Sequence, residues 1–268
     1  MGLISAAILP HGTGLLPGRG ESGNGFRAAR TAALQVCADL AESRPELLVL
    51  AWPHGLRPEG FSAAVTAESA GGRQGDLEVE VTLDRDFARR WAAACREQGW
   101  AVYGVGIGTD QGPLARLELD WGAFVPLYLL SEVLKPLPRV VLVAPRRDGA
   151  LRELIATGRV LAEVSREQRV ALIASADQAH AHRQDGPYGF HPAAAWYDSA
   201  VERLVRDGKL SSLADLDLER VHLARPDSLW QMLLLAGAIG DIRPLRCHYT
   251  APSYFGLLSA SFFRKEAS

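Results

Sequence analysis

The chain has 268 residues, of which 48% are apolar and 22% charged, and its formal net charge is −2. This composition is ordinary for a globular protein and excludes a disordered chain, and the near-neutral charge gives no indication of nucleic acid or an anionic membrane as a partner. The length suits one large α/β domain, so we expect a single domain over residues 1–268 with a sizeable core.

The cysteines and the apolar runs bear on the cellular compartment. The three cysteines are widely spaced and odd in number, which is typical of reduced thiols rather than of a disulfide framework (Cys37, Cys95, Cys247). No stretch reaches the ~18 apolar residues of a membrane span, and no charged leader precedes the first apolar run. We therefore expect a soluble cytoplasmic protein.

The triplet Pro-His-Gly occurs twice, each time directly after an apolar run that predicts a buried strand. Residues 3–9 precede the triplet of His11, and residues 47–52 precede that of His54. Ligands of open α/β sheets bind beyond the carboxyl ends of the strands, so two parallel neighbouring strands would direct both imidazoles into one cleft. Two imidazoles and one carboxylate form the facial triad of many non-haem metal sites. A histidine after a strand can equally be a loop residue bonded to backbone.

The segments around the second triplet predict several regular elements. Residues 13–25 are rich in glycine and predict a mobile loop over the site, after which Asn24 is placed to cap a helix over 27–42. Residues 77–83 alternate strictly, which indicates a strand near a sheet edge, and Asp84 is placed to cap the next helix. Further expected elements are a strand at 61–66, a helix at 85–98 and a strand at 101–105.

The glycines at 104–108 follow a strand but do not make a dinucleotide site. That fingerprint needs a helix opening directly on the glycines and an acidic residue about 20 positions later. Pro113 and a polar stretch follow instead. Nucleotide binding is therefore a weak hypothesis here.

In the second half of the chain, strands alternate with helices of 12 to 16 residues. The expected elements are an apolar helix ending near residue 135, a strand at 140–143, a helix at 151–164, a strand at 170–175 and helices at 193–207, 219–223 and 229–239. This alternation predicts an α/β fold with a central, mostly parallel (mixed) sheet covered by helices on both faces. The basic pair Arg146-Arg147 is interpreted as solvated surface.

Two further residues are candidates for the chemistry. His180 follows the strand at 170–175 most closely, and a histidine there has the pKa range to move protons near neutral pH, whereas surface positions suit His182 and His191 better. Asp227 lies at the start of the helix at 229–239, where it either caps the helix or faces the cleft and completes a set of two histidines and one carboxylate. If Asp227 is a helix cap, the carboxylate that faces the cleft would be that of Asp177 or Asp120 instead.

Six motifs in this order resemble the class III extradiol dioxygenases. These LigB-like enzymes share a superfamily with the Memo-like proteins, and the resemblance covers nearly the whole chain. The motifs are the two Pro-His-Gly triplets, Asp120-Trp121-Gly122-x-x-Val125-Pro126-Leu127, Asp177-x-x-His180, Asp185-Gly186-Pro187-Tyr188-Gly189 and Pro252-Ser253-Tyr254-Phe255-Gly256.

The resemblance implies roles for individual residues. His11 and His54 match the two metal-binding histidines, and His180 matches the acid–base histidine beside the substrate. Asp227 falls where catalytic members have a glutamate and Memo-like proteins a cysteine. Trp121 stands where the family has a second histidine, and this difference would change either the catalytic competence of the protein or its usual substrate.

The function that we expect from this resemblance is extradiol cleavage of a catechol-type ring with O₂ at a bound Fe²⁺. Trp121 and Tyr188 are candidates to stack on the ring, although ordinary packing explains them equally well. The partners would be a small aromatic substrate and O₂, and the family suggests a homodimer. Two alternatives stay open: a Memo-like metal-binding protein without dioxygenase activity, favoured by Trp121 and Asp227, and a hydrolase, because two histidines and an aspartate also suit zinc. The metal would then be zinc or copper.

Overall fold

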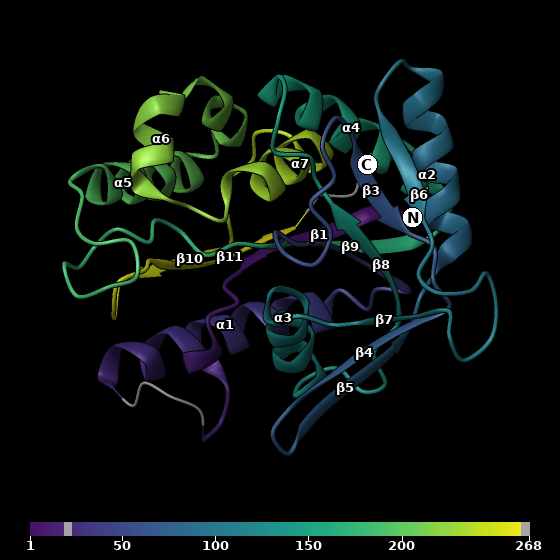
Figure 1. Ribbon diagram of the computed structural model, residues 1–268, viewed down its shortest axis with the longest axis horizontal. Helices are drawn as coiled ribbons and strands as arrows, with labels where there is room; N and C mark the ends of the chain where they lie inside the picture. The colour runs from purple at the N-terminus through teal and green to yellow at the C-terminus, as the bar shows by residue number, and fades with distance from the viewer. Residues whose placement is uncertain (19–22, 264–268) are drawn as a thin grey trace.

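A mixed sheet runs through the middle of the protein (Figure 1). Within residues 1–18 and 23–263, which the computed structural model describes, eight strands form it in the order β10-β11-β1-β9-β2-β8-β3-β6. Their bounds are β1 (Gly2–Leu9), β2 (Leu47–Ala51), β3 (Ser62–Val65), β6 (Val102–Val105), β8 (Arg139–Ala144), β9 (Arg169–Ser175), β10 (Arg246–Thr250) and β11 (Leu257–Phe263).

The four central strands are parallel. β9 pairs in parallel with β1 on one side and with β2 on the other, and β2 pairs in parallel with β8. On each side of this group the next strand, β11 or β3, is antiparallel to its neighbour. The expected mostly parallel, mixed sheet is confirmed.

The strands that carry the two histidine triplets are parallel, but they are not neighbours. β9 lies between them, so the two triplets do not follow directly neighbouring strands. The register places Ser175, the last residue of β9, beside Leu9, and Ala174 beside Ala51. Three strand ends therefore meet at one edge of the sheet, and both triplets emerge there with the end of β9 between them.

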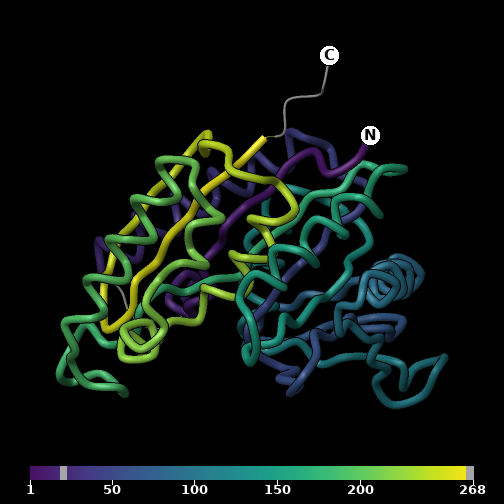
Figure 2. The backbone as a smooth tube through the Cα atoms, turned by 90° about the horizontal axis from the view of Figure 1, so that it is seen from above, coloured from purple at the N-terminus to yellow at the C-terminus, as the bar shows by residue number. Residues whose placement is uncertain are grey.

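Layers on both faces bury the apolar strands, as expected. One face carries α2 (Arg85–Glu97), α4 (Leu151–Val164), α5 (Ala193–Asp207), α6 (Leu218–Ala224) and α7 (Leu229–Ile239). The other face carries α1 (Asn24–Glu42), α3 (Trp121–Ser131) and a small sheet of β4 (Ser69–Gln74), β5 (Leu77–Thr82) and β7 (Arg116–Glu118). Alternate residues of β2 pack into opposite layers, Val49 into the first and Leu50 into the second. Figure 2 shows α5 and α2 at opposite ends of the molecule.

Several local predictions are confirmed and others are not. The helices expected at 85–98, 151–164, 193–207 and 229–239 form within one residue of those bounds, and the Asp84 side chain caps α2 by accepting from the Phe87 N–H. Asn24 is instead the first residue of α1, preceded by Gly23. β5, expected near a sheet edge, is an edge strand of the small sheet, so that prediction is confirmed. Of the loop expected at 13–25, Thr13–Leu15 is a 3₁₀ turn, and residues 19–22 lie outside the described residues.

Two glycines allow α4 and α7 to pack backbone against backbone. A Cβ on Gly158 would lie 2.1 Å from the Leu234 carbonyl oxygen, and one on Gly237 would lie 1.9 Å from that of Ile155. We expect Gly158→Ala and Gly237→Ala each to lower the free energy of unfolding by about 1–3 kcal/mol, because overpacking outweighs the ~1 kcal/mol that alanine gains in a helix. Urea unfolding measures this, with Gly106→Ala, whose Cβ would meet only an atom 3.9 Å away, as the control. An unchanged unfolding midpoint in both variants would contradict the close contact.

Candidate metal centre

His11 is buried at the end of β1, and a hydrogen-bond chain fixes its tautomer. Its Nδ1 lies 2.9 Å from the Ser175 hydroxyl, and that hydroxyl donates its only proton to the Gly122 carbonyl. Ser175 Oγ therefore accepts from His11 Nδ1–H, which leaves Nε2 unprotonated. A hydrogen-bond acceptor on the other ring nitrogen orients a metal-binding histidine in this way.

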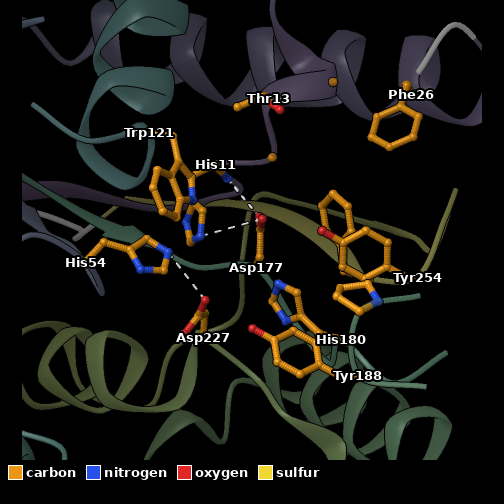
Figure 3. Close-up of a pocket in the computed structure, with 14 residues that line it drawn as sticks. His11, Thr13, Phe26, His54, Trp121, Asp177, His180, Tyr188, Asp227 and Tyr254 are labelled. Carbon is orange, nitrogen blue, oxygen red and sulfur yellow. Dashed lines mark hydrogen bonds and ion pairs between the residues drawn. The ribbon is translucent and has the colours of Figure 1, made fainter. Parts of the chain in front are cut away.

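His54 and Asp227 meet at the same edge of the sheet (Figure 3). His54 Nε2 lies 3.4 Å from Asp227 Oδ2, and the His11 and His54 rings pack edge to face with centroids 5.2 Å apart. One potential ligand atom from each of His11, His54 and Asp227 falls within 4.8 Å of the others. The structure thus brings together the three residues predicted to bind the metal. That they hold a metal stays a prediction.

Asp227 faces the histidines because its neighbours hold it there. Its backbone N–H donates to the Asp177 carbonyl, and the Gln231 side-chain amide bridges the Asp227 and Ser175 carbonyls. Arg147 donates to Asp227 Oδ1 at 2.9 Å, which leaves Oδ2 toward His54. The Asp227 side chain makes no cap bond to α7, whose preceding residue is Ser228. The capping alternative is therefore wrong.

The two alternative acids have other partners. Asp120 caps α3 through the Gly122 N–H and also accepts from the Trp52 indole. Asp177 accepts from the His11 N–H, and burial raises its pKa to about 8, so it is largely protonated at neutral pH. Burial also acts to raise the pKa of Asp227, but the positive charge of Arg147 acts against it, and the net effect is a lowered pKa. Asp227 is thus the ionised carboxylate at this edge.

The residue types fit a divalent metal. Burial and the mutual influence of the histidines lower the pKa of His11, and burial lowers that of His54, so both rings are neutral near pH 7. Two neutral imidazoles and an ionised carboxylate are the ligand set of a facial triad. These donor atoms suit iron and zinc alike.

Arg57 approaches His54 from the side away from Asp227. Its guanidinium lies 3.3 Å from His54 Nδ1 and can only donate, so a neutral His54 carries its proton on Nε2. Coordination through Nε2 requires the other tautomer, whose Nδ1–H cannot accept from Arg57. Metal binding through Nε2 therefore releases the Arg57 guanidinium from His54.

His180 lines the same cavity, of about 450 Å³, as the three predicted ligands. Its Nδ1 lies 2.9 Å from the Arg225 carbonyl, which can only accept, so Nδ1 carries the proton and Nε2 is the free base. The ring stacks on Phe255 with centroids 5.5 Å apart, and burial lowers its pKa. A neutral, oriented imidazole at a cavity is suited to general base catalysis.

Trp121 and Tyr188, the predicted substrate contacts, both line this cavity and are both exposed to solvent. The Trp121 ring lies 4.6 Å from the His54 ring, and the Tyr188 ring lies edge-on to His180 at 6.0 Å. Their aromatic faces are therefore available at the mouth of the cavity. A role for either in substrate binding stays a prediction.

The sequence interpretation missed Arg147 and Ser175. Arg147 is not solvated surface: it is partly buried, bonds to Asp227 and lies over the Trp230 ring at 4.5 Å. One signal was present in the sequence, since Arg147 follows the buried strand β8 by three residues, as the histidines follow β1 and β2. Ser175 carried no comparable signal, because its hydroxyl matters only through the register of β9.

The Ser175 hydroxyl offers a direct test of the tautomer argument. We expect Ser175→Ala to weaken metal binding by about 10–100-fold, the usual effect of losing the group that orients a metal-binding histidine. Metal titration with a competing chelator measures this, and Ser259→Ala, another buried serine of the sheet, is the matched control. Equal affinities in the wild type and Ser175→Ala would contradict the proposed hydrogen-bond chain.

Comparisons with known proteins agree with this architecture. A sequence model of the family described as the catalytic LigB subunit of aromatic ring-opening dioxygenase matches residues 5–260. Protein CA_C1420 of Clostridium acetobutylicum is 23% identical over 248 residues, which are 89% of this chain and 52% of that protein. The chain thus spans about half the length of this curated relative.

A solved structure has the same fold. The crystal structure of the uncharacterized protein JW3007 from Escherichia coli superposes with a TM-score of 0.59 at 16% identity, covering 96% of this chain and 99% of that one.

Among the described helices, none combines the length and apolar character that crossing a membrane requires.

Proposed function

This chain belongs to the family of catalytic LigB subunits of aromatic ring-opening dioxygenases, and on that premise we propose that it cleaves a catechol-type ring by extradiol insertion of both atoms of O₂. The observation that carries the proposal is the convergence of His11, His54 and Asp227 beside the free Nε2 of His180. Fe²⁺ held by the three residues would supply open positions for the catecholate oxygens and O₂.

The protein's own residues would bind the ring and move its protons. The cavity walls beside His180 are aromatic, with Phe255 stacked on the imidazole and Tyr254 tilted against Phe255 at 4.8 Å. A flat ring entering there meets His180 Nε2, which takes a phenolic proton as the substrate binds and returns a proton as the ring opens. Burial keeps the imidazole neutral and ready to accept that first proton.

A second candidate function is metal binding without dioxygenase activity, as in the Memo-like proteins. The observation that favours it is Trp121, which packs against His54 at the position where the family has a second histidine. The indole cannot exchange a proton as an imidazole does. Trp121 therefore cannot share proton transfer with His180.

Oxygen uptake distinguishes these functions. We would load the protein anaerobically with Fe²⁺ or Zn²⁺, add a panel of catechols and record O₂ consumption and product absorbance. The proposal expects rapid uptake, one O₂ for each ring and a yellow ring-opened product with iron alone. Tight zinc binding without oxygen uptake for any catechol would overturn it in favour of the Memo-like function or a zinc-dependent hydrolase.

A further inference from the structure

A buried aspartate contacts the segment that carries His180. Asp198 lies on the buried face of α5, with Ala194 and Val201, and is 2% exposed. It does not line the cavity that holds His180 and the predicted metal ligands. Burying a carboxylate is costly unless its oxygens have hydrogen-bond partners, so the partners of Asp198 indicate its role.

One oxygen of Asp198 binds the backbone next to His180. Its Oδ1 accepts from the Ala179 N–H at 2.8 Å, and Ala179 directly precedes His180. Ala179 is fully buried, so water cannot replace this acceptor unless the backbone moves. Asp198 therefore holds residues 178–182, which we call the His180 segment, in its present place.

The other oxygen of Asp198 has two partners. Oδ2 accepts from the Tyr249 hydroxyl of β10, and it lies 2.7 Å from Nε2 of His182. Burial and the Asp198 carboxylate raise the pKa of Tyr249, so the phenol keeps its proton and donates at neutral pH. The side chain of His182 is only 16% exposed, and it is held against α5 rather than free at the surface.

A glycine of the motif at 252–256 makes room for the carboxylate. A Cβ on Gly256 would lie 2.1 Å from Asp198 Oδ2. The backbone of Gly256 also pairs with the His180 segment, because its N–H donates to the Ala179 carbonyl and its carbonyl accepts from the Gln178 N–H. The absence of a side chain at 256 therefore lets the carboxylate and the two backbone segments meet.

The direction of the His180 ring depends on this backbone. The His180 N–H donates to the Ala224 carbonyl at 3.0 Å, and its Nδ1 lies 2.9 Å from the Arg225 carbonyl. The ring lines the cavity with Nε2 as its free base (Figure 3). A shift of the His180 segment would draw Nδ1 away from the Arg225 carbonyl and would turn Nε2 from its present direction.

We propose that Asp198 is a positioning residue for His180, and that by accepting the Ala179 N–H it fixes the His180 segment so that Nε2 faces the cavity. The inference rests on the proposed function for the role of His180 as the base. It adds a residue outside the cavity on which the orientation of that base depends.

The first test is kinetic. We expect Asp198→Ala to lower kcat about 10²-fold with little change in KM, because a small misplacement of a reacting group has an effect of that size and Asp198 does not line the cavity. Asp198→Asn keeps an oxygen for the Ala179 N–H and should retain most of the activity. Oxygen uptake by the iron-loaded variants, with the catechol that the wild type cleaves fastest, measures both constants.

A role that acts through His180 predicts that two substitutions are not additive. Adding Asp198→Ala to His180→Gln should leave the residual kcat unchanged, because the base that Asp198 positions is already absent. A merely structural role would lower this residual kcat further.

The tautomer of His180 gives a readout without turnover. In the ¹⁵N-labelled, zinc-loaded wild type, the His180 side-chain signals, assigned by their absence from His180→Gln, should show the proton on Nδ1. In Asp198→Ala we expect the Nε2–H form to appear, because the Arg225 carbonyl then no longer holds the proton on Nδ1.

The matched control removes another buried carboxylate. Asp39 on α1 is 5% exposed and accepts from Arg246 and Ser261, neither of which belongs to the His180 segment. Asp39→Ala should lower the melting temperature, as Asp198→Ala does, but keep the wild-type kcat and tautomer. If Asp198→Ala does not fold, Gly256→Ala takes its place with the same expectations, because its Cβ would displace the carboxylate.

The outcomes distinguish this inference from the proposed function. A wild-type kcat or an unchanged Nδ1–H tautomer in folded Asp198→Ala overturns the inference and leaves the dioxygenase proposal standing. The same loss of kcat in Asp39→Ala also overturns it. A changed tautomer in Asp198→Ala, with no O₂ uptake by the iron-loaded wild type, supports the positioning role and overturns the dioxygenase.

Discussion

His54→Ala is expected to lose stoichiometric metal binding, with an affinity for Fe²⁺ or Zn²⁺ reduced by more than about 100-fold, a larger loss than removal of a group that only orients a ligand causes. The physical reason is that the site offers three protein ligand atoms within 4.8 Å of one another, and two cannot form a facial triad. His11→Ala and Asp227→Asn should behave in the same way. Metal analysis after anaerobic reconstitution and desalting measures the loss.

The burial of His11 calls for a control on folding. His11 is 1% exposed and its replacement by alanine leaves the Ser175 hydroxyl without its donor, whereas His54 is only partly buried. His54→Ala is therefore the decisive variant, and its melting curve should match that of the wild type without metal. His248→Ala, on β10 and outside the lining of the cavity that holds the predicted ligands, should bind metal normally. If His11→Ala and His54→Ala retain as much metal as the wild type, these histidines do not form the site.

His180→Gln is expected to lower kcat by about 10²–10⁴-fold while metal content stays unchanged, because a general base contributes that much to proton transfer. Glutamine can still donate to the Arg225 carbonyl, so the segment after β9 should keep its conformation. Oxygen uptake by the iron-loaded variant measures kcat, and metal analysis of the same sample excludes loss of the site. A variant that turns over at the wild-type rate would remove His180 from the mechanism.

The pH profile of the wild type gives an independent check on the same residue. Burial lowers the pKa of His180 from its ordinary value of 6.5, so the neutral, proton-accepting form persists below the pH at which a free histidine becomes protonated. Activity should therefore hold through neutral pH and fall only as the pH drops through this lowered pKa. The lowered pKa of this imidazole would be contradicted if the wild-type activity falls with an apparent pKa above 6.5 and the residual activity of His180→Gln shows no such fall.

The sequence by itself determined the class of fold and most of the longer elements. Apolar runs such as residues 170–175 are buried on both faces of the sheet, and helices such as α4 and α7 begin and end where the apolar periodicity predicted. These features are local, because the spacing of apolar residues and the turn residues at the ends depend on near neighbours in the chain. The Pro-His-Gly triplets similarly marked the ends of β1 and β2.

Only the tertiary structure decided how the site is assembled. The sequence left open whether Asp227 caps a helix or faces the histidines, and the answer depends on Arg147, which follows β8 and lies 80 positions earlier in the chain. Likewise, β9 lies between the two histidine strands, and its last residue, Ser175, fixes the tautomer of His11. Strand order and hydrogen bonds between distant residues arise from packing of the whole sheet. A local sequence pattern gives no information on strand order or on these hydrogen bonds, because each of them joins residues that are far apart in the chain.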